Sequence, residues 1–398
     1  MPGFEVIGPE EQAEVDDVFA RGGVLFRHGF DALRGDCYKV REFETAFAAV
    51  MGAPYALAVT SGTAALRVAL AALGISAGDE VITQSFTFVA TVEAIIEAGA
   101  TPVCAEIDDT FNLDPADLER RINGRTRAVI AVHMLGTPAR LPEIRAICRK
   151  HNLLLIEDTA WGCGGSLLGR PLGTWGEIGT FSFDFAKTMT TGEGGMILFN
   201  SKHYYELAAA WHDHGHENNP SVPRWEDTRS GSGFNYRMME LQGAVGLAQL
   251  RKLPSVVATQ QANRNRLWEA IQNLPGITPR GAPEGAQETA DALVFTVPDR
   301  EAALRCRAAL LARGVSTKIL PEATTWHFAG TWTHMPELVA AHGGDLGAAF
   351  PRSRGLLERA VSLPVTVKMS DALPQTIRMA LMEALSGTAS TPLQKSGT

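Results

Sequence analysis

The stretch Phe181–Gly195 reads F-S-F-D-F-A-K-T-M-T-T-G-E-G-G, and the rest of the chain is interpreted from it. Phenylalanine at every second position predicts a half-buried strand, which stops near Ala186. Lys187 follows, and the Thr- and Gly-rich residues after it predict a turn with positive φ or close backbone approach. A lysine at a strand end among aromatic rings is poorly hydrated, which lowers the pKa of its amine and makes it a nucleophile near neutral pH. The alternative is a surface lysine on a hairpin.

A second stretch supplies a carboxylate in a matching position. Leu153–Ile156 is a continuous apolar run, as expected of a strand buried on both faces, and it ends in Glu157 and Asp158. Open α/β sheets bind ligands at the carboxyl ends of such strands. A lysine for a Schiff base and an aspartate for a pyridinium nitrogen are the pair that pyridoxal phosphate (PLP) chemistry requires. A helix N-cap is the alternative role for Asp158.

A third stretch predicts a phosphate site. Small residues, including Gly62 and Thr63, join a short apolar strand to a helix. Such a turn exposes backbone N–H groups at the positive end of the helix, where phosphate binds. By itself the turn is better explained as an ordinary helix cap. With Lys187 and Asp158 in the same chain, we assign Gly62 and Thr63 to the cofactor phosphate.

The order of the predicted elements indicates the fold. Strands alternate with helices between residues 55 and 132, which predicts parallel βαβ units and an α/β sheet with helices on both faces. Helical patterns follow Asn235–Arg237 and recur over 256–274. Further runs predict a strand at 292–297, a helix at 301–313 and a strand at 315–319, the elements of a smaller α+β domain.

We therefore expect two domains and two terminal segments, as befits a chain of 398 residues. The division is residues 1–34, a lead-in that packs with the small domain; 35–255, the large PLP-binding domain; 256–387, the small C-terminal domain; and 388–398, a polar tail expected to be disordered.

Composition narrows the classes of function. The net charge of −8 argues against a nucleic acid or an anionic membrane surface as partner. Five scattered cysteines without metal spacing predict reduced thiols of a cytoplasmic protein. The first residues lack the pattern of a signal peptide, and no apolar run approaches the roughly 20 residues that a membrane span needs.

These motifs, in their order and spacing, resemble the PLP-dependent sugar aminotransferases of the DegT/DnrJ/EryC1/StrS type. The resemblance runs from about Gly35 to Leu381 and implies fold type I of the PLP-dependent transferases, the aspartate aminotransferase fold. The matching segments are Ser61–Leu66, Thr87–Thr91, Val132–Gly136, Glu157-Asp158, Phe181–Phe183 with Lys187, Gly192–Gly195 and Asn235–Met238.

The resemblance implies an activity and roles for residues. Lys187 would hold PLP and act as base and acid in transamination, with glutamate or glutamine as amino donor. Phe88 would stack on the cofactor ring, although it is equally well explained as a core aromatic, and the Ser182 hydroxyl would bond the cofactor phosphate. Asn235 would reach the phosphate of a neighbouring subunit, so the protein would be a homodimer with shared active sites.

Trp161 departs from the family pattern, which has Gln or His three residues after the aspartate. Tryptophan has one donor and no acceptor, so it cannot replace the usual contact to the ring oxygen. We expect Trp161 to remain in the cofactor site, where it stacks or shapes the substrate pocket.

Substrate contacts are the least determined part of the prediction. The run 211–217 alternates histidines, but no other ligands complete a metal site, and we predict a loop beside the substrate pocket with no metal. His133 is expected to support the site. Aromatic and polar residues of the small domain are expected at the cleft between the domains, although they are equally well explained as its core and surface. The candidate substrate residues are His133, His214, His216, Lys318, Trp326 and His327.

The substrate itself is left open among three kinds of keto sugar. Most of the family acts on nucleotide-linked 3-keto or 4-keto hexoses, and some members act on keto-cyclitols. The residues Met1–Glu5 and the loop Asp213–His216 are similar to the branch that aminates C8 of an 8-keto-3-deoxy-octulosonate, a lipopolysaccharide sugar. Two rival functions are a PLP-dependent sugar dehydratase, against which Lys187 argues, and a PLP-binding regulator, which no helix-turn-helix or basic region supports.

Overall fold

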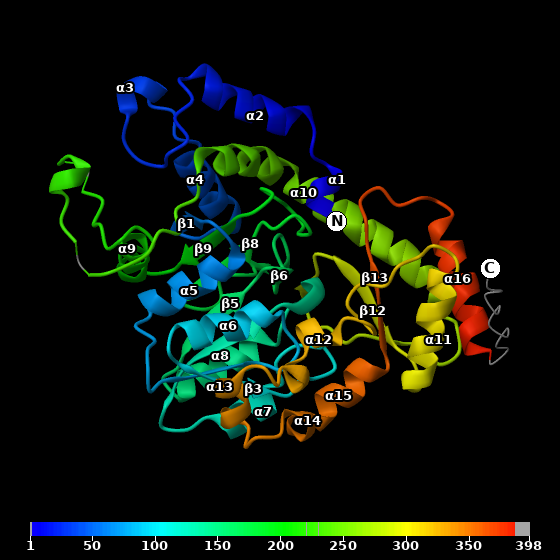
Figure 1. The fold of residues 1–398 in the computed structure, drawn as a ribbon. Helices are drawn as coiled ribbons and strands as arrows, with labels where there is room; N and C mark the ends of the chain where they lie inside the picture. Colours follow the sequence, from blue (N-terminus) through cyan, green and yellow to red (C-terminus); the bar gives the residue numbers. More distant parts are fainter. Residues whose placement is uncertain (1, 220, 230, 387–398) are drawn as a thin grey trace, which may run out of the picture.

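The computed structural model describes residues 2–219, 221–229 and 231–386. Within these residues the central sheet has seven strands in the order β1-β9-β8-β5-β4-β2-β3 (Figure 1). The five strands from β8 to β3 are parallel, whereas β9 runs antiparallel to both of its neighbours. The predicted α/β fold with a mostly parallel sheet is therefore confirmed. The strands are β1 (Tyr55–Val59), β2 (Glu80–Gln84), β3 (Thr101–Ala105), β4 (Thr126–Val132), β5 (Leu154–Asp158), β8 (Ile178–Ser182) and β9 (Gly195–Phe199).

Helices cover both faces of this sheet. Alternate residues of β4 point to opposite faces, so Ile130 packs in the cluster of α5, α6 and α9, whereas Val129 packs in the cluster of α7 and α8. Near β1, the same second face is covered by α4 and α10. These helices are α4 (Lys39–Met51), α5 (Gly62–Ala72), α6 (Val89–Glu97), α7 (Pro115–Arg121), α8 (Leu141–Lys150), α9 (Lys202–Trp211) and α10 (Glu240–Ile271), and a 3-10 turn, η1 (Met134–Gly136), follows β4.

The strand before Lys187 differs from its prediction. β8 ends at Ser182 and is buried along its whole length, because β5 and β9 flank it and helices cover both of its faces. Phe183 lies beyond the strand and packs with Phe43 and Phe47 of α4 at centroid distances of 5.4 and 5.6 Å. Phe185 is exposed. The alternating phenylalanines therefore belong to a strand end and the turn after it, rather than to one half-buried strand.

One long helix replaces the two helical stretches predicted after Asn235. α10 contains 32 residues, with Pro254 inside it, and it begins at Glu240. A proline inside a helix removes one hydrogen bond. Tertiary packing compensates here, because α2 and α4 pack on α10, as does α16. The predicted domain border at residue 255 therefore falls within a continuous helix.

A second sheet lies beyond α10, with the order β10-β12-β13 and antiparallel pairing. α11 and α16 pack against it and enclose a separate core. The strand predicted at 315–319 is wrong: Ile319 has φ of 72°, which breaks an extended run, although the Lys318 N–H still donates to the Ser362 carbonyl at 2.8 Å. The elements are β10 (Thr278–Pro279), β12 (Ala292–Thr296), β13 (Ala360–Pro364), α11 (Arg300–Leu311) and α16 (Leu373–Leu385).

The segment from residue 324 to residue 358 packs on the large sheet domain. Phe328, Trp332 and Phe350 share one core cluster with Phe86 and Trp161. The small domain therefore closes over the region where β2 and β5 end. The elements are α12 (Thr324–His327), η3 (Ala329–Thr331), α13 (Pro336–Ala341), α14 (Leu346–Ala349) and α15 (Pro351–Glu358), and a small third sheet is formed by β6 (Ser166–Leu167), β7 (Arg170–Pro171) and β11 (Ala286–Gln287).

The lead-in forms three short helices, of which α2 packs along α10 (Figure 1). A 3-10 turn, η2, lies in the loop that precedes α10. No helix in the described part of the chain is long and apolar enough to cross a membrane. The tail predicted to be disordered, 388–398, lies outside the described residues. The remaining elements are α1 (Pro2–Glu5), α2 (Pro9–Ala20), α3 (Asp31–Arg34) and η2 (Arg224–Glu226).

Candidate active site

A cavity of about 310 Å³ lies at the carboxyl ends of β5 and β8. This position follows from the parallel pairing of the two strands, which brings their carboxyl ends to one edge of the sheet. Residues predicted separately from three stretches of sequence meet in its wall. The predicted residues that line it are Gly62, Thr63, Phe88, Asp158, Trp161, Ser182, Lys187 and His327.

Lys187 reaches into this cavity from the turn after β8. Its amine lies 3.4 Å from the centroid of the Trp161 ring. Burial lowers the pKa of Lys187 to about 8, with a further lowering by the Lys318 charge, while Asp291 and Asp158 act in the opposite direction. Since the ordinary value is 10.5, a much larger fraction of the amine is neutral at physiological pH than for a surface lysine. The group has the character of the nucleophile that the sequence predicted.

Asp158 ends β5 on the floor of the cavity and is 6% exposed. Its carboxylate accepts hydrogen bonds from the Thr91 hydroxyl at 2.9 Å and from the Ala160 N–H at 3.2 Å. Burial raises the pKa of Asp158, while these two donors and the Lys187 charge oppose the rise. The two hydrogen bonds fix the carboxylate, and a cationic partner in the cavity would stabilise its charged form.

The start of α5 forms a cradle for an anion. Ser61 caps the helix by accepting a hydrogen bond from the Ala64 N–H at 3.1 Å. A Cβ at Gly62 would lie 2.6 Å from the Ser182 Cβ, so only glycine lets the helix start approach that serine. Backbone N–H groups and the Ser182 hydroxyl therefore line one end of the cavity. This donor set suits a phosphate.

Aromatic side chains form the wall on the side of the small domain. Phe88 stacks with Trp326 at a centroid distance of 6.5 Å and an interplanar angle of 15°. It also contacts His327 at 5.6 Å. Burial lowers the pKa of His327 to about 4, so its ring is neutral at physiological pH. Phe88 is 38% exposed and offers a flat surface to a planar ring.

The Trp161 ring lies beside Lys187 and beside a charged pair of the small domain. The Lys318 amine lies 5.0 Å from the Trp161 ring centroid and forms an ion pair with Asp291 at 2.5 Å. The Thr289 hydroxyl donates to the Trp161 carbonyl at 3.0 Å. Trp161 is therefore held by both domains, with its ring beside two ammonium groups.

Six predicted residues do not line this cavity. Two of them, Lys318 and Trp326, contact the lining residues Trp161 and Phe88, respectively. His133 is buried beneath it, where its Nε2 lies 3.2 Å from Glu157 Oε2 and its Nδ1 accepts from the Ala139 N–H. His214 and His216 lie on the loop after α9, and His216 pairs with Asp227 at 3.2 Å. Asn235 is exposed on its own chain and lies outside the cavity lining. No group of three potential metal ligands occurs in the described residues.

Two residues of the site were not singled out from the sequence. Thr91, one helical turn after Phe88, donates to Asp158, and the helical spacing of that segment could have indicated this. Asp291 directly precedes β12 and forms an ion pair with Lys318. No local pattern marks it, because its partner comes from a distant part of the small domain.

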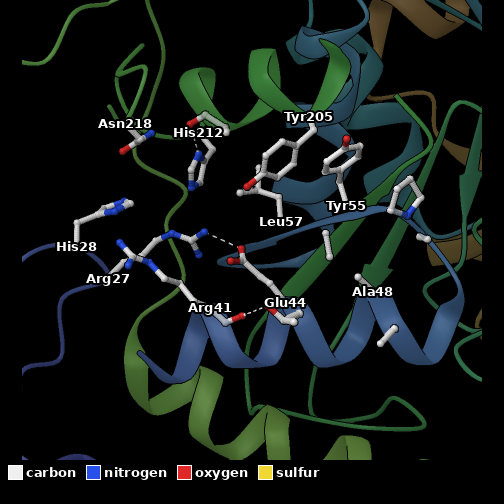
Figure 2. A pocket seen from close by; sticks show the side chains of 16 residues that line it. Arg27, His28, Arg41, Glu44, Ala48, Tyr55, Leu57, Tyr205, His212 and Asn218 are labelled. Carbon is white, nitrogen blue, oxygen red and sulfur yellow. Dashed lines mark hydrogen bonds and ion pairs between the residues drawn. The ribbon is translucent and has the colours of Figure 1, made fainter. Parts of the chain in front are cut away.

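A larger cavity, of about 720 Å³, lies between α4, β1 and α9 (Figure 2). It shares no lining residue with the Lys187 cavity. Arg27 forms an ion pair with Glu44 at 2.6 Å at one end of it, and alanines of α4 line another part. It lacks a lysine and aspartate pair, so the chemistry predicted from the sequence belongs to the smaller cavity.

Residues 30–382 match the DegT/DnrJ/EryC1/StrS aminotransferase family, and the chain belongs to this family. It is 33% identical over 380 residues to the spore coat polysaccharide biosynthesis protein SpsC of Bacillus subtilis (strain 168), with 92% of each chain covered. It is 43% identical over 222 residues to a GDP-perosamine synthase of Caulobacter vibrioides (strain ATCC 19089 / CIP 103742 / CB 15), covering 55% of this chain and 58% of that protein.

Solved structures agree with this assignment. The aminotransferase TlmJ from Streptoalloteichus hindustanus superposes with a TM-score of 0.82 at 26% identity, and the coverage is 96% of this chain and 98% of that one. DesV from S. venezuelae, solved with a ketimine intermediate, superposes with a TM-score of 0.81 at 27% identity and covers 94% of each chain. The fold and the family assignment together identify the chain as an aminotransferase.

Proposed function

We propose that this member of the DegT/DnrJ/EryC1/StrS aminotransferase family uses PLP to move an amino group from glutamate or glutamine to a ketone on a sugar. The observation that carries the proposal is the meeting of Lys187 and Asp158 in one cavity beside a phosphate cradle. PLP, when bound, supplies an electron sink for the carbon that loses its proton. The residues present fit that group at its aldehyde, its ring nitrogen and its phosphate.

Each role follows from the chemistry of a side chain in the cavity. Lys187 holds the cofactor and, once released, moves the proton as base and then acid, for which its lowered pKa suits it. Asp158 would supply a fixed negative charge for the ring nitrogen of the cofactor. Gly62, Thr63 and Ser182 hold the phosphate, and Phe88 stacks on the ring.

Trp161 shapes the pocket in which the sugar binds. Its ring already lies beside Lys187, and its carbonyl is held by Thr289 of the small domain. Tryptophan cannot accept a hydrogen bond, so its contribution is packing, contact with cations and one N–H. The candidates for contact with polar groups of the substrate are Lys318, whose amine lies 5.0 Å from the centroid of this ring, and His327, which lines the cavity.

The substrate is a keto sugar of cell-surface polysaccharide or natural-product biosynthesis. Names of the relatives support this class: one is a spore coat polysaccharide protein, another a GDP-perosamine synthase. A relative from Micromonospora echinospora carries the name "Putative L-glutamine:3-amino-2,3-dideoxy-scyllo-inosose aminotransferase". These names favour a nucleotide-linked hexose or a keto-cyclitol over the eight-carbon keto acid. We place the enzyme in the cytoplasm, which its free cysteines support.

Transfer of label tests the function. The holoenzyme is supplied with ¹⁵N-glutamate or ¹⁵N-glutamine and with a nucleotide-linked 4-keto hexose, a 3-keto hexose, scyllo-inosose or the 8-keto octulosonate. We expect ¹⁵N in one of these sugars, detected by mass spectrometry. Label that reaches only simple 2-keto acids would contradict a sugar substrate. A protein that binds PLP but labels no acceptor would support the alternative of a PLP-binding regulator without catalysis.

The same assay on Trp161→Gln examines the pocket. We expect the cofactor affinity and the rate of the half-reaction with the amino donor to be unchanged. The rate of the half-reaction with the sugar should fall. Loss of PLP affinity by more than about tenfold, roughly 1.4 kcal/mol, would make Trp161 a cofactor residue instead.

We further propose that the active sites are shared between two subunits, with Asn235 serving the phosphate of the partner's site. The exposure of Asn235 outside the cavity of its own chain supports this arrangement. Mixing Asn235→Ala chains with Lys187→Ala chains should restore activity, because one site of each hybrid dimer keeps both residues. An absence of recovery after proven subunit exchange would contradict a shared site.

A further inference from the structure

The first helix, α1, lies against the turn that carries Lys187. The Gly3 N–H donates to the Lys187 carbonyl at 3.0 Å. A Cβ at Gly3 would lie 2.8 Å from the Thr190 nitrogen and 2.9 Å from the Met189 carbonyl carbon. Both atoms belong to the backbone, so the turn leaves no room for a side chain at Gly3. This contact joins two residues that lie more than 180 positions apart in the sequence.

The next residue extends this contact to the other side of the lysine. The Phe4 ring lies 4.8 Å from the Phe185 ring, centroid to centroid, at an angle of 51°. Phe185 precedes Lys187, whereas Met189 and Thr190 follow it. The first helix therefore touches the backbone or side chains on both sides of the lysine. Motion of the lysine backbone would break at least one of these contacts.

Side chains of α2 and α10 hold the same turn indirectly. The Thr190 N–H donates to the Gln249 side-chain oxygen at 3.2 Å, and the Gln249 amide donates to Glu11 at 2.9 Å. Lys252 pairs with Glu11 at 2.7 Å and donates to the Val6 carbonyl at 2.8 Å. Glu11 and Gln249 are buried. The lead-in and the lysine turn thus share one hydrogen-bonded network.

The opposite end of the helix reaches the small domain. The Glu5 carboxylate accepts a hydrogen bond from the Lys368 N–H at 2.7 Å, in the segment after β13. Residues 2–6, which we name the N-terminal strap, therefore connect the small domain to the lysine turn. Figure 1 shows α1 beside the middle of α10, between the two parts of the molecule.

We propose that the N-terminal strap positions Lys187, with Gly3 and Phe4 as positioning residues for the transamination proposed above. The Gly3 N–H holds the Lys187 carbonyl, and this bond fixes the point from which the side chain reaches toward Asp158 and Trp161. A displacement of the reacting group by 1 Å can cost about 10²-fold in rate. A loosened strap would therefore slow proton transfer without removing any group that performs it.

A matched pair of glycine variants tests this inference. Gly3→Ala forces a Cβ against the backbone of Met189 and Thr190. Gly8→Ala, at the start of α2, makes only ordinary contacts, with Glu10 Oε2 at 3.5 Å and the Val6 carbonyl oxygen at 4.0 Å. The first readout is made on the protein freed of cofactor: the pH at which the Lys187 amine is half-modified by trinitrobenzenesulfonate, from peptide mass maps. Wild type and Gly8→Ala should give a midpoint near pH 8. Gly3→Ala should move it toward the ordinary lysine value, because the displaced amine is less buried.

The second readout is the half-reaction of the holoenzyme with the amino donor, which should fall about tenfold in Gly3→Ala and stay unchanged in Gly8→Ala. Equal midpoints and rates within twofold for the two variants would overturn the inference. If Gly3→Ala does not fold, Phe4→Ala decides, since it removes only a largely exposed ring and should shift the same midpoint. The modification profile does not depend on any sugar substrate, so it separates failure of the strap from failure of the proposed function.

Discussion

Lys187→Ala should bind PLP without a covalent bond and should lose transamination by at least about 10³-fold. The substitution removes both the covalent attachment and the general acid–base group, each of which contributes orders of magnitude in enzymes of this kind. Asp158, Ser182 and the Gly62-Thr63 turn remain to hold the cofactor. The measurement is the single-turnover rate of the half-reaction with glutamate or glutamine, together with the absorption spectrum of the bound cofactor.

Lys202→Ala is the matched control, because Lys202 is exposed on α9 and pairs with Glu206 at 3.1 Å. It should retain the rate and spectrum of the wild type. Substantial turnover by Lys187→Ala, under conditions where added amines are absent, would show that another group performs the proton transfer.

Asp158→Asn should lower the same half-reaction by about 10²–10³-fold at saturating PLP, while Lys187 still holds the cofactor. The asparagine keeps the shape of the side chain and an acceptor for the Thr91 hydroxyl or the Ala160 N–H. It loses the negative charge opposite the ring nitrogen. The magnitude is that of a preorganised electrostatic contact in a water-poor site.

Asp184→Asn tests whether position or charge alone matters. Asp184 also lines the cavity, and its carboxylate accepts from the Ala186 N–H at 2.9 Å. The charge change is the same in both variants, but only Asp158 ends the central strand β5. Equal losses in the two variants would indicate a general effect of cavity charge and would remove the special role assigned to Asp158.

The sequence predicted the residues of the site best where local pattern and topology agree. Lys187 and Asp158 follow apolar strands, and the parallel pairing of β5 with β8 brings their carboxyl ends together. The Gly62 turn was predicted in the same way, from a strand followed by small residues and a helix. In each case the residue lies at an element boundary that hydrophobic periodicity reveals.

Contacts that depend on the closure of the small domain could not be predicted. The Lys318–Asp291 pair joins a turn near β12 to the segment 315–319, which was wrongly predicted as a strand from its hydrophobicity. The left-handed backbone of Ile319 has no signature in its side chain. His214 and His216 lie on a loop where tertiary partners such as Asp227, rather than periodicity, decide which way a ring points.

The contact of Gly3 with the turn that carries Lys187 could not be predicted from the sequence either. A glycine near a chain end is an ordinary feature of sequence, and only the fold places it against Met189 and Thr190. In contrast, the two helical stretches predicted after Asn235 and over 256–274 form one helix, α10, which continues through Pro254 because three helices pack on it.

Borohydride reduction of the purified holoenzyme, followed by peptide mass mapping, tests the central claim most directly. Reduction converts the Schiff base between lysine and PLP into a stable adduct that survives digestion. The account predicts one pyridoxyl group per chain, on the peptide that contains Lys187. An adduct on Lys318, the other ammonium group beside Trp161, or on no lysine at all, would contradict it.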